Sequence, residues 1–66
     1  MEITVNGERR DVGPSTTVEL LVTQLVADTA GVAVAVNATV VPRSRWASTP
    51  LDNGAQVEVL TAAPGG

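Results

Sequence analysis

EITVNGERRDV, residues 2–12, contains two short runs of different character on either side of the dipeptide Asn6-Gly7. The first run alternates polar and apolar residues, which is the pattern of a strand with one buried face. Asn-Gly is the strongest short signal for a β-hairpin because both central residues of a type I′ turn need a positive φ. The second run, residues 8–12, is highly charged and suits a sheet edge, where charge discourages pairing with another molecule. We therefore expect an antiparallel hairpin at the start of the fold.

A helix is predicted after this hairpin, beyond the break at residues 13–15, GPS. Residues 16–19 fit a capping box, with Thr16 as the N-cap and Glu19 reaching back to it. Four apolar residues then recur at the spacing of one helix face: Val18, Leu21, Val22 and Leu25. Gly31 is expected to follow the last turn, as glycine commonly does at helix ends. The pattern predicts one helix of about 12 residues, an ordinary length for a globular protein, with its apolar face on a sheet.

Three more extended segments are expected after the helix. Residues 32–36, VAVAV, predict a strand with valines on one face and alanines on the other. A turn at residues 37–38 leads into a short extended piece, residues 39–41. The last strand is predicted at residues 56–60, QVEVL, with Val57 and Val59 facing the core.

The segment between the last two strands is irregular, and we expect one turn of 3₁₀ helix in residues 42–46. Trp46 and Leu51 are expected to fill the core beneath this loop. For Arg43 and Arg45 the simplest expectation is a solvated loop, and ion pairs with a partner are the alternative.

The order of hairpin, helix and strands predicts an α+β fold, with one helix packed on a mixed sheet of four or five strands. Placing the last strand parallel to the first gives a ubiquitin-like β-grasp. We assign residues 1–61 to this single domain and residues 62–66 to a flexible C-terminal tail.

Composition excludes several kinds of function. The 66 residues include no cysteine and no histidine, which removes thiolate chemistry, the commonest metal ligand and the commonest general base. The net charge of −3 argues against binding to nucleic acid. No apolar run approaches the length of a membrane span. The residues after Met1 have the pattern of a strand rather than of a signal peptide. We expect a soluble cytoplasmic protein that binds no metal, membrane or nucleic acid.

The sequence closes on residues 61–66, TAAPGG. Two glycines at a chain end suit passage through a narrow slot, because they have no Cβ to obstruct close approach to another backbone. A domain boundary or an expression remnant would leave the same residues. Pro64 biases Ala63 towards an extended conformation and has no N–H to donate.

The whole chain resembles the ThiS family, the sulfur carriers of bacterial thiamine biosynthesis. The resemblance rests on the hairpin, the helix start TTVELL and the strand GVAVAVN, and then on VVPRSRWA, LDNGAQVEVLTA and the terminal Gly-Gly, in this order. A terminal Gly-Gly alone is weak, because ubiquitin-like carriers of several kinds share it. The VPRSRWA segment, residues 41–47, followed by this tail is the more specific signal.

The resemblance implies a protein co-substrate rather than an enzyme. An E1-like adenylating enzyme of the ThiF type would activate the Gly66 carboxylate with ATP, a persulfide donor would supply sulfur, and thiazole synthase of the ThiG type would take it from a thiocarboxylate. The chain itself would bind no cofactor. Partner contacts are expected at Gly65, Pro64, Ala63 and Leu60, although Leu60 could equally pack within the sheet.

Other functions remain open on the sequence. A molybdopterin-synthase-type carrier shares the expected fold, the tail and adenylation, and a carrier for another sulfur pathway would do so too. A ubiquitin-like modifier would be joined through Gly66 to lysines of target proteins. A pure interaction module would not need Gly65 and Gly66 at all.

Overall fold

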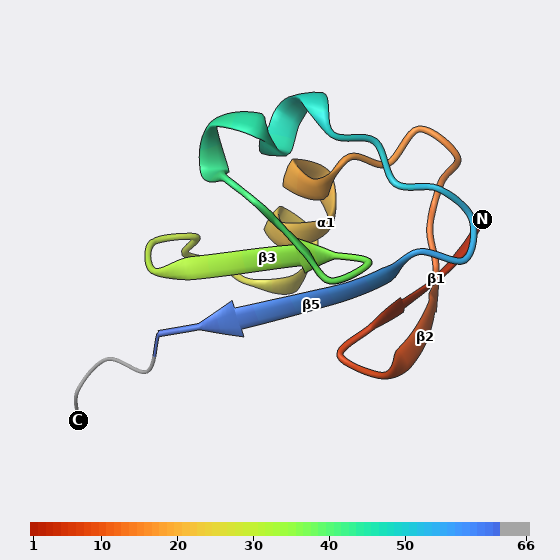
Figure 1. Cartoon of the computed structure of the whole chain (residues 1–66), viewed down its shortest axis with the longest axis horizontal. Coiled ribbons are helices and arrows are strands. Elements are labelled where there is room, and N and C mark those ends of the chain that lie inside the picture. The colour runs from red at the N-terminus through yellow and green to blue at the C-terminus, as the bar shows by residue number, and fades with distance from the viewer. Residues whose placement is uncertain (63–66) are drawn as a thin grey trace.

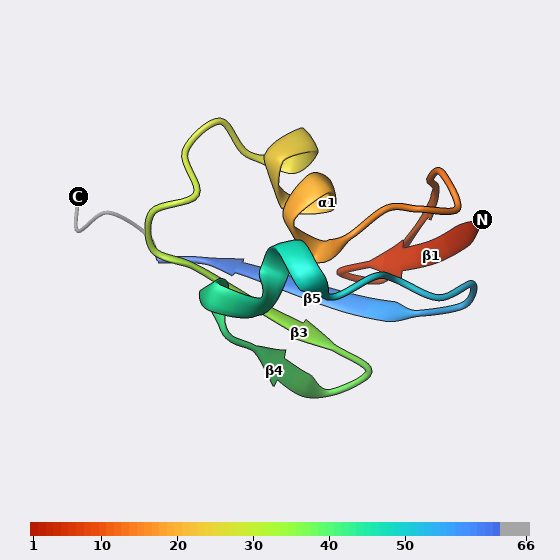
Figure 2. The same ribbon diagram turned by 90° about the horizontal axis from the view of Figure 1, so that it is seen from above.

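The computed structural model describes residues 1–62 and consists of one mixed sheet covered on one face by two helical segments. In chain order the elements are β1 (Glu2–Val5), β2 (Glu8–Asp11), α1 (Val18–Leu25), β3 (Val32–Val36), β4 (Thr39–Val41), the 3₁₀ helix η1 (Arg43–Ser48) and β5 (Gln56–Thr61). Figures 1 and 2 show α1 and η1 on the same side of the sheet. The α+β prediction is confirmed, with five strands.

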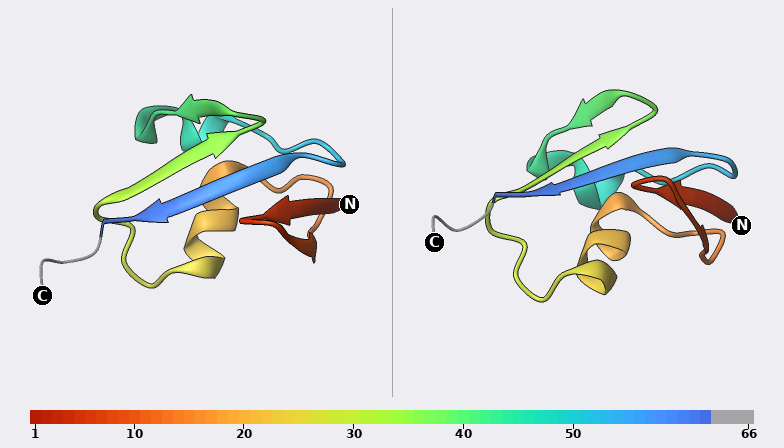
Figure 3. Two further views of the ribbon diagram at one scale, coloured as in Figure 1. Left: turned by 60° about the horizontal axis from the view of Figure 1, so that its bottom comes forward. Right: turned by 90° about the horizontal axis from the view of Figure 1, so that it is seen from below.

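The strand order is β2-β1-β5-β3-β4, so the last strand occupies the centre of the sheet. β1 and β5 are parallel, with Thr4 opposite Gln56 and Val5 opposite Val57. The other neighbouring pairs are antiparallel. β5 runs away from the N-terminus, and its last residues lie at the opposite end of the molecule (Figure 3). This arrangement is the predicted β-grasp.

The core lies between the sheet and the helices. In β1, β3 and β5 the side chains alternate between the two faces of the sheet, so one set of apolar side chains faces the helices. The apolar face of α1 packs against this set. The buried apolar residues are Ile3, Val5, Val18, Leu21, Val22, Val34, Trp46, Leu51, Ala55, Val57 and Val59. The expected burial of Trp46 and Leu51 is confirmed, and Val57 and Val59 face inward as predicted. The indole Nε1 of Trp46 donates to the Val41 carbonyl at 3.0 Å, so its one polar group is satisfied.

The helix begins one residue later than predicted, with Thr17 rather than Thr16 as its N-cap. The Thr17 side chain accepts a hydrogen bond from the Leu20 N–H at 3.3 Å. Thr16 is buried, and its carbonyl accepts from the N–H of Leu51 at 2.9 Å. The next residue, Thr17, forms a β-bridge with Pro50 in the segment before β5 and has extended backbone, so the helix cannot begin before Val18. Within residues 1–62 Glu19 returns no hydrogen bond to the cap, so the predicted capping box does not form.

The helix is also shorter than predicted, because it ends at Leu25 and not just before Gly31. Val26 is the C-cap, in extended conformation, and its N–H still bonds to the Val22 carbonyl at 3.0 Å. Asp28 then accepts from the N–H of Ala30 at 2.9 Å, a short-range bond that favours a turn over a continued helix. Gly31 does adopt a positive φ of 73°, but in the turn that leads into β3.

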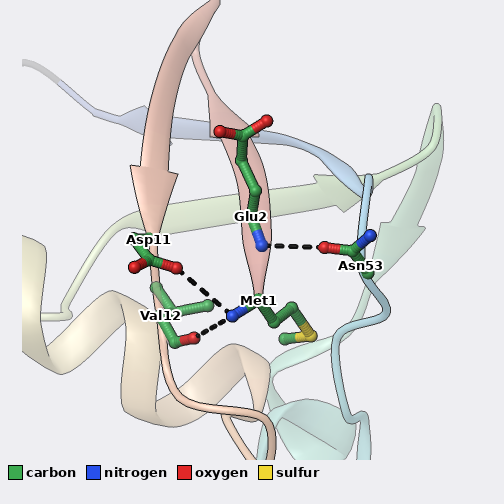
Figure 4. Close-up of polar contacts among 5 residues, drawn as sticks. All are labelled: Met1, Glu2, Asp11, Val12 and Asn53. Carbon is green, nitrogen blue, oxygen red and sulfur yellow. Dashed lines mark hydrogen bonds and ion pairs between the residues drawn. The ribbon is translucent and has the colours of Figure 1, made fainter.

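Hydrogen bonds from the first two residues hold the start of the N-terminal strand in place (Figure 4). The amino group of Met1 donates to Asp11 Oδ1 at 3.2 Å and to the Val12 carbonyl at 2.9 Å. The N–H of Glu2 donates to Asn53 Oδ1 at 2.8 Å, from the loop before β5. These bonds fix the start of β1 to the end of β2 and to the loop before β5.

Candidate functional site

Of the predicted functional residues, only Leu60 lies within the residues that the structure describes. Ala63, Pro64, Gly65 and Gly66 lie outside the residues that the structure describes. Leu60 lies near the end of β5, and Ala62 is the last described residue before the tail. The geometry of the site is therefore that of the surface from which the tail departs.

Leu60 is exposed on the sheet face that the helices do not cover. Its side chain is 65% accessible, whereas its neighbour Val59 is 9% accessible and faces the core. Leu60 lies opposite Ala33 on β3. Ala35, on the same face of β3, lies opposite Val40 on β4, which is 71% accessible. We call Leu60, Ala33, Ala35 and Val40 the outer apolar patch.

The base of the tail, which we call the tail root, is the contact between Ala62 and Gly31. The Ala62 N–H donates to the Gly31 carbonyl at 2.9 Å, one residue past the final pairing of Thr61 with Val32. A Cβ on Gly31 would lie 3.3 Å from the Ala62 Cβ, and the positive φ at Gly31 also disfavours a side chain. A glycine therefore suits both the turn and the close approach of the last strand.

Arg43 is exposed, as expected from the sequence, but it lies in the 3₁₀ helix η1 rather than in a loop, and its side chain is bonded within the chain. Its guanidinium donates to the Thr29 hydroxyl at 3.1 Å and to the Thr29 carbonyl. The same group lies over the Trp46 ring, 4.8 Å from the ring centroid. The spacing of Arg43 and Trp46 could have indicated this contact, because residues three apart eclipse on a 3₁₀ helix.

An open groove of about 370 Å³ lies between the end of α1 and the first hairpin. Its lining includes Val5 and Val59 from the sheet, the charged side chains of Glu8 and Arg10, and Thr61 at the end of β5. The groove is therefore adjacent to the tail root.

The part of the chain that the structure describes has neither a cluster of metal-binding side chains nor a membrane-spanning helix. Residues 1–62 contain no group of three or more acidic, histidine or cysteine side chains placed to hold a metal ion. Over the same residues, no helix has the length and apolar character needed to cross a membrane.

A five-stranded mixed sheet with its first and last strands parallel at the centre, crossed by one helix, defines a protein of the ubiquitin-like β-grasp class. Comparison with family models matches residues 3–66 to the ThiS family. The chain belongs to the ThiS family.

Two solved structures are similar to this chain in both sequence and fold. A crystal structure of a thiamine biosynthesis protein, ThiS, from Geobacter metallireducens is 36% identical, with a TM-score of 0.81 over the whole of both chains. A solution structure of a thiamine biosynthesis protein from the same organism is 36% identical, with a TM-score of 0.77 over the whole of this chain and 88% of the other.

A curated relative is longer than this chain. It is a thiazole synthase of Paramagnetospirillum magneticum, and it is 36% identical over all 66 residues. The chain spans 20% of the length of that relative.

Proposed function

We propose that this protein is a sulfur carrier for thiazole formation in thiamine biosynthesis, and that it acts through a thiocarboxylate at Gly66. The observation that carries the proposal is the family match, which covers residues 3–66 and so includes Gly65 and Gly66. The two similar solved structures are described as thiamine biosynthesis proteins, which supports the same pathway.

The chemistry of the chain limits where sulfur could be carried. The 66 residues include no cysteine, so no side-chain thiol is present to form a persulfide. The Gly66 carboxyl group is the remaining acceptor of suitable chemistry. A carboxylate is a poor electrophile because it is negatively charged, and it must be activated before a sulfur nucleophile can attack its carbon.

The proposed reaction proceeds through partner enzymes. The Gly66 carboxylate attacks the α-phosphorus of ATP on an E1-like adenylating enzyme of the ThiF type, and pyrophosphate leaves. A persulfide sulfur then attacks the acyl adenylate and AMP leaves. A thiol cleaves the resulting S–S bond, is oxidised to a disulfide and leaves the thiocarboxylate on Gly66. Thiazole synthase takes this sulfur, and the carboxylate is regenerated.

The synthase partner has independent support. This chain is similar to one fifth of a protein named thiazole synthase, so a ThiS-like sequence and a synthase occur there in one polypeptide. We infer that this chain presents its sulfur to a synthase of the same ThiG type. The tail would enter the partner's pocket while the outer apolar patch contacts its surface.

The test is the intact mass of the protein after incubation with ATP, cysteine and an extract of the host. We expect one oxygen to be replaced by one sulfur, with fragmentation placing the sulfur on Gly66. The matched control is the chain without Gly66, which should keep its mass under the same conditions. A second control omits ATP.

Two results would contradict the proposal. An unchanged mass, in an extract that thiocarboxylates another carrier, would exclude this chemistry for the chain. A ladder of larger conjugates with target lysines would instead identify a ubiquitin-like modifier. If the sulfur is gained, supplying purified thiazole synthase or molybdopterin synthase distinguishes the two carrier types by which one consumes it.

A further inference from the structure

A continuous series of contacts leads from the core to the tail root. It begins at Trp46, which is 4% accessible and is fixed by its bond to the Val41 carbonyl. It continues through Arg43, whose guanidinium lies on the Trp46 ring and donates twice to Thr29. Three groups of different chemistry therefore hold one arginine in one place: an aromatic face, a hydroxyl and a carbonyl.

The bonds from Arg43 to Thr29 also restrict the turn before β3. The Thr29 carbonyl accepts from the N–H of Val32 at 3.2 Å as well as from Arg43. These bonds fix the turn on both sides of Gly31, whose carbonyl accepts from Ala62. The position of that carbonyl sets where the last described residue of the chain lies.

Nothing in the core requires the Arg43 side chain to be charged. Arg43 is exposed, whereas Trp46 in the same 3₁₀ helix is buried. A guanidinium offers a planar fork that bonds two acceptors and stacks on an aromatic ring at the same time, which an ammonium group does not. The particular contribution of this arginine is therefore the link between η1 and the turn at Thr29.

The geometry points to Arg43 as a positioning residue for the tail. It holds Thr29, and through it Gly31, so that Ala62 leaves the sheet from a fixed point. The inference rests on the proposed function for its consequence: with the tail root already fixed, Ala62 need not be ordered when the chain binds the adenylating enzyme.

The size of the effect follows from the cost of ordering. Fixing the backbone of one more residue on binding weakens association by roughly tenfold. We therefore expect Arg43→Ala to raise the KM for the carrier in adenylation by about tenfold, the cost of one newly freed residue. The kcat should stay within about twofold, because the reacting carboxyl group itself is unchanged once bound.

The experiment compares Arg43→Ala with Arg45→Ala in the full-length protein. Arg45 lies in the same 3₁₀ helix, is also exposed, and carries the same charge, but its side chain makes no hydrogen bond or ion pair among residues 1–62. Arg43→Lys tests rescue and should recover only part of the effect. Gly31→Ala disturbs the same link from its other end, without touching Arg43.

Two readouts are needed. The first is amide hydrogen exchange at Ala62 in the free protein, with the Val57 amide in the central strand as the measure of global stability. We expect exchange at Ala62 to accelerate about tenfold in Arg43→Ala and in Gly31→Ala, beyond any change at Val57, as for a local opening. Arg45→Ala should match the wild type. The second readout is carrier-dependent ATP–pyrophosphate exchange by the adenylating enzyme, analysed for KM and kcat separately.

The outcomes separate the two proposals. Equal Ala62 exchange in Arg43→Ala and Arg45→Ala overturns the inference, and so does faster exchange with an unchanged KM. Matching changes in exchange and KM support it. A wild-type protein that promotes no ATP–pyrophosphate exchange contradicts the proposed function, while the Ala62 comparison still decides whether Arg43 holds the tail root.

Discussion

Asn6 has two separate tasks at the first turn. Its φ is 51°, followed by 85° at Gly7, as a type I′ turn requires. Its side chain also reaches β5, where Oδ1 accepts from the Val59 N–H at 2.9 Å and Nδ2 donates to the Val59 carbonyl at 3.1 Å. The amide thus continues the parallel pairing of β1 and β5 one step beyond the end of β1.

Substitutions at Asn6 should separate these two tasks. Asn6→Gly keeps the positive φ but removes both bonds to Val59, and we expect it to lower the free energy of unfolding by about 1 kcal/mol. Asn6→Ala also places a Cβ in the left-handed region, so the loss should reach about 2–3 kcal/mol. Urea denaturation measures both. Equal stability of Asn6→Gly and wild type would show that the bonds to Val59 contribute nothing.

At this scale the sequence predicts what is local and misses what is distant. The Asn6-Gly7 turn is recognisable because both residues of the signal are adjacent. The bonds from Asn6 to Val59 span 53 positions, and those from Arg43 to Thr29 span 14. No short pattern specifies such partners, because they depend on how the strands and loops come together.

At the scale of the element, α1 shows tertiary contacts overriding local signals. Its apolar face was predicted correctly, because Val18, Leu21 and Val22 are all buried. Both of its ends were predicted wrongly. The start is displaced because the backbone of Thr16 pairs with the segment before β5, and the end because the chain turns at Val26.

Thr17 should therefore be the residue whose hydroxyl stabilises the helix. We expect Thr17→Ala to lower the free energy of unfolding by about 1 kcal/mol, the usual effect of losing an N-cap. Glu19→Ala is the control, and loss of a surface side chain without a cap bond should change stability by less than about 0.5 kcal/mol. Thermal or urea unfolding checks both. A larger effect at Glu19 than at Thr17 would restore the capping box that the sequence suggested.

At the scale of the whole molecule, the two faces carry exposed leucines in different settings. Leu60 lies in the outer apolar patch near the tail root, whereas Leu20 is 51% accessible on the helix. The parallel pairing of the last strand with the first, and with it the β-grasp, was predicted from the order of elements and from the resemblance. Exposure of Leu60 was one of two open alternatives, because alternation alone does not say whether a sheet face is covered. Its role in partner binding stays a prediction.

The pair of leucines provides a matched test of the docking face. Leu60→Gln should weaken binding to the adenylating enzyme by about tenfold, within the range for loss of a central apolar contact. Leu20→Gln removes a similar exposed leucine from the opposite face and should leave binding unchanged. Both should unfold within about 0.5 kcal/mol of wild type, because both side chains are already exposed. Calorimetry or surface plasmon resonance measures the affinity, and equal affinities would place the docking face elsewhere.

The central position of β5 has a consequence for the time course of synthesis. Within residues 1–62 the hairpin of β1 and β2 and the hairpin of β3 and β4 do not pair with each other, and each reaches the other only through β5. A nascent chain whose residues 56–61 have not yet left the ribosome therefore has two separate hairpins that are not joined into one sheet. Pairing over such sequence distances is slow compared with local structure. The five-stranded sheet can therefore form only after β5 has been synthesised. β5 is also the strand that leads into residues 62–66.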